Sequence, residues 1–168
     1  MTNSYFHDEN VRNFLIKNIA SFTPTIFFTV GFYHSSNNSN CGFVPRDIQR
    51  NILKSFPNEL KKLSFGRRST KNFYMDYISV FEDLNKFRSE NVAPHFHAVV
   101  SSSCDDLIVK NINKLCDSGF KNKCLFPLYR DIKTVFDDGQ SLKKYIFKNF
   151  ADESSFNDIV SYRNILNI

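Results

Sequence analysis

Several features that mark large classes of protein are missing from this sequence. Its 168 residues include no tryptophan, only five glycines and only four cysteines, and no two cysteines form a Cys-x-x-Cys pair. Neither a zinc knuckle nor a disulfide framework is therefore indicated, and a reducing compartment fits best. No apolar run approaches the roughly 20 residues that span a bilayer, and the polar, acidic N-terminal stretch does not have the pattern of a signal peptide. We expect a cytoplasmic protein with no membrane partner.

Motor motifs are missing as well. The sequence contains no Gly-x-x-x-x-Gly-Lys-Ser/Thr loop, and the run Gly66-Arg-Arg-Ser-Thr lacks that spacing. We therefore expect no helicase domain in this chain. The length suits one domain with a sizeable core, so we predict a single domain over residues 1–168.

Phenylalanine and basic residues are what the sequence has in excess. Its 19 Phe and 7 Tyr predict a core built largely from aromatic side chains. The net charge of +5 favours a partner that carries phosphates, although a merely soluble basic surface explains it equally well. The densest basic cluster offers Arg67, Arg68 and Lys71 as candidate contacts to a phosphate backbone, with Lys144 as a further candidate. A solvated loop is the alternative for that cluster.

Hydrophobic periodicity predicts a mixture of helices and strands, an α+β fold class. We expect helices over 5–20, 45–63, 141–150 and 151–168, the second of them broken near Pro57, and another helix that Gly119 ends. We expect strands over 25–33, 73–81, 94–100 and 131–136. A polar connection over 83–93 joins the second and third strands, which most simply form an antiparallel hairpin. Ser101 to Ser103 are expected to cap the helix that follows.

Two histidines flank one apolar residue in the strand over 94–100. Successive side chains of a strand point to opposite faces, so His95 and His97 point the same way while Phe96 faces the core. Two imidazoles at this spacing predict a metal clamp, and the alternative is a hydrogen-bonded polar face of the sheet. The hairpin carries Glu82 towards the same end of the sheet as His95, which adds a carboxylate to the two imidazoles.

A tyrosine and a lysine lie downstream on the predicted helix over 141–150. Tyr145 and Lys148 are three residues apart and are therefore neighbours on one helix face. Two imidazoles and one carboxylate leave open positions on a divalent cation, as a catalytic site requires. A Tyr145 phenolate could then form a covalent phosphodiester with a nucleic-acid strand, with Lys148 or the cation favouring its ionised form. Taken singly, Glu82, Tyr145 and Lys148 are better explained as ordinary surface or packing residues, and it is their order along the chain that favours a site.

Three short motifs in this order resemble the HUH endonuclease superfamily, in its replication-initiator (Rep) branch from rolling-circle plasmids and single-stranded DNA viruses. The motifs are Phe27-Phe28-Thr29, His95-Phe96-His97 and Tyr145-Ile146-Phe147-Lys148. The resemblance implies a five-stranded antiparallel sheet, the ferredoxin/RRM-like palm of that superfamily, with flanking helices and a bound Mg²⁺ or Mn²⁺. It also implies that Tyr145 nicks single-stranded DNA at an origin and so initiates rolling-circle replication, leaving a 5′-phosphotyrosine link and a free 3′-hydroxyl.

The same resemblance assigns the remaining roles. Glu82 is the best placed third metal ligand, with Asp76 and Glu90 as less favoured candidates. Lys148 would orient the scissile phosphate or a water molecule. The partners implied are single-stranded DNA or an origin hairpin, together with a host helicase and polymerase. Because one tyrosine stands in the nucleophile position, the chain is similar to the single-tyrosine enzymes.

Other interpretations stay open. Asn149 lies four residues after the tyrosine position, which is similar to single-strand transposases of the same superfamily, whereas a relaxase would use a tyrosine near Tyr5 and a third histidine. A non-catalytic origin-binding module would keep the sheet and bind through residues such as Arg67 and Arg68, with a steep dependence on salt. A structural metal in an unrelated α+β fold would hold the chain together, and a chelator would then unfold it.

Overall fold

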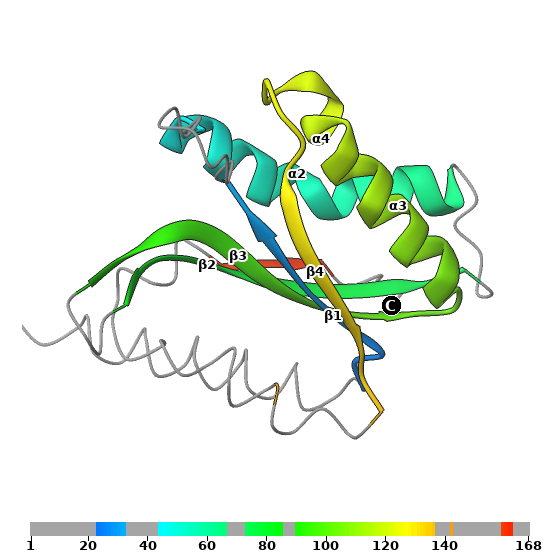
Figure 1. Ribbon diagram of the computed structural model, residues 1–168. Coiled ribbons are helices and arrows are strands. Elements are labelled where there is room, and N and C mark those ends of the chain that lie inside the picture. The colour runs from blue at the N-terminus through cyan, green and yellow to red at the C-terminus, as the bar shows by residue number, and fades with distance from the viewer. Residues whose placement is uncertain are drawn as a thin grey trace, which may run out of the picture.

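A computed structural model describes residues 23–32, 44–66, 73–85, 90–136, 142 and 159–162 (Figure 1). The α+β class is confirmed. The elements in chain order are β1 (Ile26–Gly31), α2 (Arg46–Phe65), β2 (Met75–Asn85), β3 (Glu90–Ser102), α3 (Asp105–Asp117), α4 (Gly119–Asn122), β4 (Tyr129–Thr134) and β5 (Ile159–Tyr162). The helices predicted over 5–20 and 141–150 lie outside the described residues, apart from residue 142.

The strands form one antiparallel sheet in the order β4-β1-β3-β2-β5. Its centre is the four-stranded arrangement β2-β3-β1-β4, in which β3 pairs with β2 on one side and with β1 on the other. The predicted hairpin between β2 and β3 is confirmed. The short strand β5, red in Figure 1, pairs with the outer edge of β2.

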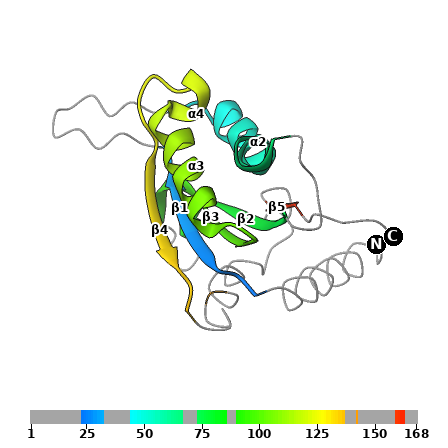
Figure 2. The ribbon, with the colours of Figure 1, turned by 90° about the vertical axis from the view of Figure 1, so that its right-hand side faces the viewer.

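Helices α2 and α3 lie against the same face of the sheet (Figures 1 and 2). Helix α2 buries a stripe of apolar residues at helical spacing, and α3 buries a second one. The buried residues of these two stripes include Ile52, Leu53, Phe56, Leu60, Ile108, Ile112 and Leu115. Among the described residues, no helix has both the length and the apolarity that crossing a membrane requires.

The core between the sheet and the helices is aromatic, as the composition predicts. Phe96 of β3 is fully buried, and its ring centroid lies 5.4 Å from that of Phe56 on α2 and 5.8 Å from that of Phe32. Phe28 on β1 contacts both Phe56 and Phe96. Edge-to-face and tilted pairs of this kind contribute about 0.5–1.5 kcal/mol each beyond their buried area. Phe96 is therefore held at the centre of the core, with the helix face of the sheet fixed around it.

The predicted break at Pro57 is wrong, because α2 continues through this residue as one helix from Arg46 to Phe65. Proline removes one helical hydrogen bond, which normally destabilises a helix. Here the Pro57 ring is buried, and so are Phe56 and Leu60 on the same helix. Burial of this apolar stripe against the sheet offsets the lost hydrogen bond, a tertiary effect that local sequence rules do not include.

The final helix predicted over 151–168 is wrong at Ile159–Tyr162, the part of it that the structure describes, because these residues form β5. This strand pairs with Tyr77, Ile78, Ser79 and Val80 of β2. Two adjacent β-branched residues, Ile159 and Val160, favour the extended conformation. The open edge of β2 supplies backbone partners for the strand, and that edge is not visible in the local sequence.

Two further boundaries differ from the sequence prediction. The hairpin extends into the expected polar connection, since β2 runs to Asn85 and β3 begins at Glu90. Strand β3 also continues to Ser102, so the helix cap falls on Cys104 rather than on the three serines. The Ser102 hydroxyl accepts a hydrogen bond from the Cys104 backbone N–H at 3.0 Å.

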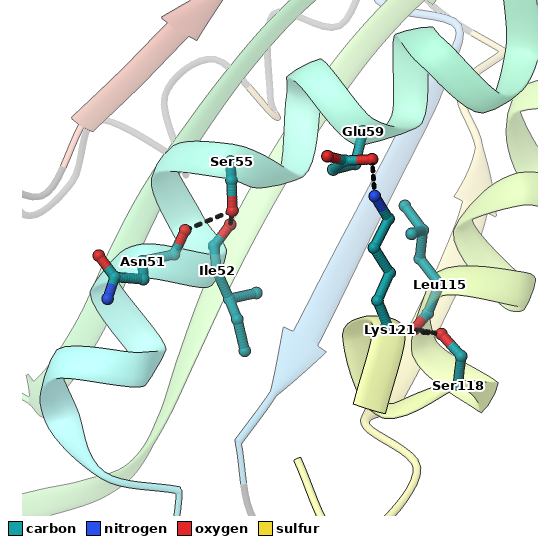
Figure 3. A network of polar contacts seen from close by, with 7 residues as sticks. All are labelled: Asn51, Ile52, Ser55, Glu59, Leu115, Ser118 and Lys121. Carbon is teal, nitrogen blue, oxygen red and sulfur yellow. Dashed lines mark hydrogen bonds and ion pairs between the residues drawn. The ribbon is translucent and has the colours of Figure 1, made fainter. Parts of the chain in front are cut away.

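Helix α4 is a single turn with a left-handed backbone. Gly119, Phe120, Lys121 and Asn122 all have φ between 52° and 64°. The Phe120 ring is buried and stacks on Phe56 at 5.5 Å. Lys121 forms an ion pair with Glu59 of α2, and the Ser118 hydroxyl donates to the Leu115 carbonyl at 3.0 Å (Figure 3). These contacts with α2 and α3 hold a backbone conformation that non-glycine residues otherwise disfavour.

Gly119→Ala is expected to destabilise the protein more than Gly66→Ala. Both glycines have positive φ, but a Cβ at Gly119 would lie 2.7 Å from the backbone oxygens of Cys124 and Phe126, whereas a Cβ at Gly66 would meet nothing within 4 Å. Gly66→Ala therefore reports backbone strain alone, about 1–3 kcal/mol. Urea unfolding of the two variants checks the order, and equal losses would contradict the close approach at Gly119.

Candidate metal centre

Three side chains converge on the face of the sheet opposite α2 and α3. Because Phe96 faces the helices, the neighbouring His95 and His97 face away from them. The register of the hairpin places Glu82 directly opposite His95. The His95 Nε2 atom lies 3.1 Å from His97 Nε2 and 3.5 Å from Glu82 Oε2, and the His97 Nε2 atom lies 3.7 Å from the same oxygen. The predicted convergence of these three residues is confirmed, and together they form a group that could hold a metal ion.

The spacing of the three atoms fits a divalent cation. A circle through points 3.1, 3.5 and 3.7 Å apart has a radius of about 2.0 Å, which matches the distances of about 2.0–2.2 Å from zinc or magnesium to nitrogen and oxygen ligands. No side chain has to move far for all three atoms to reach one ion. A carboxylate as buried as Glu82, whose side chain is 9% exposed, also favours a positive partner. The donor set therefore fits a metal in both geometry and charge.

The two histidines differ in their surroundings. His97 is 6% exposed, and its ring stacks on Phe27 at a centroid distance of 5.6 Å and an interplanar angle of 22°. Its Nδ1 atom lies 2.8 Å from the Thr29 hydroxyl oxygen. The side chain of His95 is 19% exposed, and its opposite residue on β1 is Gly31, which has no side chain. His97 is thus held on two sides, whereas His95 lies at the more open side of the group.

The contacts of Phe27 and Thr29 with His97, at the candidate site, are details that sequence reasoning missed. Both residues belong to the first motif, but the motif alone assigns them no partner. Their alternate positions on β1 put them on one face, and the antiparallel register brings Thr29 opposite His97. The pairing of β1 with β3 is the information that would have identified these contacts.

A register shift lies immediately beside the centre. The ladder between β2 and β3 is regular up to the pair Glu82 and His95 and resumes with Leu84 and Asn91. Pro94 lies within this irregular stretch, and proline has no N–H to donate to a ladder. Bulges twist and bend the strands that carry them and often lie next to functional sites. This bulge ends the regular pairing of β2 with β3 immediately after the pair Glu82 and His95.

The backbones of the two less favoured ligand candidates lie away from the group. Asp76 pairs with Ser101 and Glu90 pairs with Asn85, so each lies several residues along β2 or β3 from the centre. Glu82 is therefore the carboxylate that the structure brings to the histidines.

The other predicted site residues lie outside the described residues. These are the catalytic candidates Tyr145 and Lys148, and the DNA-contact candidates Arg67, Arg68, Lys71 and Lys144. Their roles stay predictions.

Two other nucleophilic side chains in the described part of the chain are poorly suited to the site. Tyr77 is fully buried on the helix face, and burial raises the pKa of its hydroxyl. Cys116 is buried on α3, and burial raises the pKa of its thiol to about 12. Tyr129 differs, because it is 49% exposed and shares a cross-strand row with Gly31, His95 and Glu82. Its Cα lies two strands, about 10 Å, from that of His95.

Removal of one ligand is expected to weaken binding of Mn²⁺ by more than about 100-fold, since loss of a residue that only orients a ligand already costs about 10- to 100-fold. His97→Ala and Glu82→Gln test this by isothermal titration calorimetry. Glu59→Gln is the matched control, because Glu59 pairs with Lys121 on the helix side. Unchanged affinity in both ligand variants would contradict the proposed centre.

Removal of the metal with a chelator is expected to leave the protein folded. The aromatic core lies on the helix face and includes none of the three ligands. A bound ion at 100 times its Kd would add about 2.7 kcal/mol, so the chelator should lower the midpoint of thermal unfolding without abolishing the transition. Circular dichroism with and without chelator checks this, and loss of the folded spectrum would instead identify a structural metal.

No protein-family model, curated protein or solved structure matches the chain. The α+β fold, the antiparallel sheet and the His-x-His/Glu group therefore rest on the structure itself. The likeness to the HUH superfamily stays a prediction from its three short motifs.

Proposed function

We propose that this protein is a metal-dependent endonuclease and strand transferase of HUH type that acts on single-stranded DNA. The observation that carries the proposal is the convergence of His95, His97 and Glu82 within 3.7 Å of one another on an antiparallel sheet. This is the arrangement that the His-hydrophobe-His motif and the hairpin predict. The biological role that fits this chemistry is nicking of an origin to initiate rolling-circle replication.

The number of ligands supports a catalytic role. Structural zinc sites usually have four protein ligands, whereas catalytic sites have three and keep positions open. In the described part of the chain, the group consists of three residues. When bound there, a divalent cation would polarise a phosphoryl oxygen of the DNA backbone and stabilise the leaving oxygen. The mixed nitrogen and oxygen donors suit Mn²⁺ better than Mg²⁺, which prefers oxygen ligands.

The residues of the chain would divide the remaining work. His95, His97 and Glu82 hold the cation against the rigid sheet. The Tyr145 phenolate attacks the scissile phosphorus, so that a bond from the phenolic oxygen to phosphorus forms as the bond to the 3′-oxygen breaks. The 3′-oxygen leaves and takes up a proton as a free hydroxyl. Lys148 favours the ionised tyrosine and orients the phosphate, and attack by that 3′-hydroxyl reverses the reaction and rejoins the strand.

The charge of the chain suits this substrate. A net charge of +5 favours association with a phosphate backbone, and Arg67, Arg68, Lys71 and Lys144 are the candidate contacts. Single-strand transposases and relaxases of the same superfamily are the alternatives, and they would use the same kind of metal and the same kind of nucleophile. The chemistry proposed here is common to these alternatives.

Tyr145→Phe is expected to abolish a covalent adduct with single-stranded DNA while binding stays nearly intact. The phenyl ring keeps the shape of the side chain but lacks the attacking oxygen. The measurement is a denaturing gel of protein incubated with a labelled pool of random single strands and hairpins, with Mn²⁺ or with chelator. A shifted band that needs both Mn²⁺ and Tyr145 is the expected result.

Tyr129→Phe is the matched control, because this half-exposed tyrosine lies in the same row of the sheet as His95 and Glu82. It should form the adduct at the wild-type level. Loss of the adduct in Tyr129→Phe but not in Tyr145→Phe would move the nucleophile to β4. Binding without any adduct across the pool would instead favour a non-catalytic DNA-binding module.

A further inference from the structure

Both ring nitrogens of His97 have a close polar neighbour. Nδ1 lies 2.8 Å from Oγ1 of Thr29, which is the residue directly opposite on β1. Nε2 lies 3.1 Å from Nε2 of His95 and 3.7 Å from Oε2 of Glu82. The contact with Thr29 holds the Nδ1 side of the ring, and Nε2 faces the candidate metal position.

In the metal-free protein, each of these two short contacts requires one hydrogen between its atoms. A neutral imidazole carries one hydrogen, on either nitrogen, so only two arrangements of His97 satisfy both contacts. In the first, Nδ1–H donates to Thr29 and Nε2 accepts from His95. In the second, the Thr29 hydroxyl donates to Nδ1 and Nε2–H donates to His95. Only in the first does His97 Nε2 carry no hydrogen, so that its lone pair can bind a metal once the hydrogen of His95 has moved away.

We propose that Thr29 accepts the hydrogen bond from Nδ1–H of His97 and so presets this ring to coordinate through Nε2. Thr29 is then a positioning residue for the metal centre. The inference rests on the proposed function in one respect, that His97 is a metal ligand. The hydroxyl of threonine can accept one hydrogen bond and still donate its own hydrogen elsewhere. Thr29 is also partly exposed, so that hydrogen can reach water.

The surroundings of the two rings support this assignment. His97 is 6% exposed and stacked on Phe27, so water has little access to an Nδ1–H that lost its acceptor. The Glu82 oxygen is nearer to Nε2 of His95, at 3.5 Å, than to Nε2 of His97. A hydrogen on Nε2 of His95 therefore has two acceptors close by, which favours His95 as the donor between the rings.

The two histidines consequently play different parts in metal binding. His97 is already in the tautomer that binds, because its hydrogen is on Nδ1. His95 carries its hydrogen on Nε2 and must move it to Nδ1 before it can coordinate. Its side chain is the more exposed of the two, at 19% against 8%, so solvent can exchange that hydrogen. Thr29 thus removes one of two rearrangements that would otherwise oppose binding.

Thr29→Val tests the inference, because valine keeps the branched shape and removes the hydroxyl. The first measurement is the ¹⁵N chemical shifts of the imidazoles in the metal-free protein in alkaline buffer. Wild type and Thr29→Ser should show His97 with the hydrogen on Nδ1, and Thr29→Val should shift the ring towards the Nε2–H tautomer. A wild-type His97 with its hydrogen on Nε2 overturns the inference, and this outcome does not depend on any variant folding.

The second measurement is the Mn²⁺ dissociation constant from calorimetry. Thr29→Val should weaken binding by about 10- to 100-fold, the usual effect of losing the partner of a ligand histidine, while Thr29→Ser stays close to wild type. Thr134→Val is the matched control, since Thr134 is an exposed threonine on β4. Equal binding by wild type and Thr29→Val overturns the role of Thr29 and leaves the metal centre intact. Absence of Mn²⁺ binding by wild type refutes the metal centre itself. The ¹⁵N shifts of His97 still show in that case whether Thr29 sets the tautomer of the ring.

Discussion

The burial of Phe96 is the constraint on which the candidate site depends. Its ring packs against Phe28, Phe32 and Phe56, which fixes the face of β3 that meets the helices. Because successive side chains of a strand point to opposite faces, the inward direction of Phe96 turns His95 and His97 to the opposite face. A slip of the pairing by one residue would turn the imidazoles into the aromatic core and turn the phenylalanine to the opposite face of the sheet. Imidazoles without hydrogen-bond partners in that core would cost free energy, and this cost keeps both histidines aligned.

The two strands that pair with β3 place different residues opposite the two histidines. Strand β2 brings Glu82 opposite His95, and the ladder loses its regular register directly afterwards. Strand β1 brings Thr29 opposite His97 and Gly31 opposite His95. One histidine is therefore oriented by a hydroxyl, while the other has a carboxylate on one side and no side chain on the other. The asymmetry of the centre follows directly from the residues that face β3.

The sequence predicted the parts of this arrangement that depend on alternation and on neighbouring strands. The common direction of His95 and His97, the inward direction of Phe96 and the approach of Glu82 are all confirmed by the register of β2 and β3. What the sequence could not provide was pairing between distant segments. The role of Thr29 depends on β1 lying beside β3, and the strand at Ile159–Tyr162 depends on the open edge of β2. The uninterrupted helix through Pro57 likewise depends on burial against the sheet.

The three candidate ligands lie outside the aromatic cluster of the helix face, and this placement has a consequence for how the site can change. The helix face carries the aromatic cluster and contains none of the three ligands, so replacement of a ligand leaves the main core intact. Replacement of Phe96 would disturb both the core and the direction of the two histidines at once. Substitutions of the three candidate ligands can therefore alter or remove metal binding while the fold persists. Metal binding and covalent adduct formation therefore have to be measured separately.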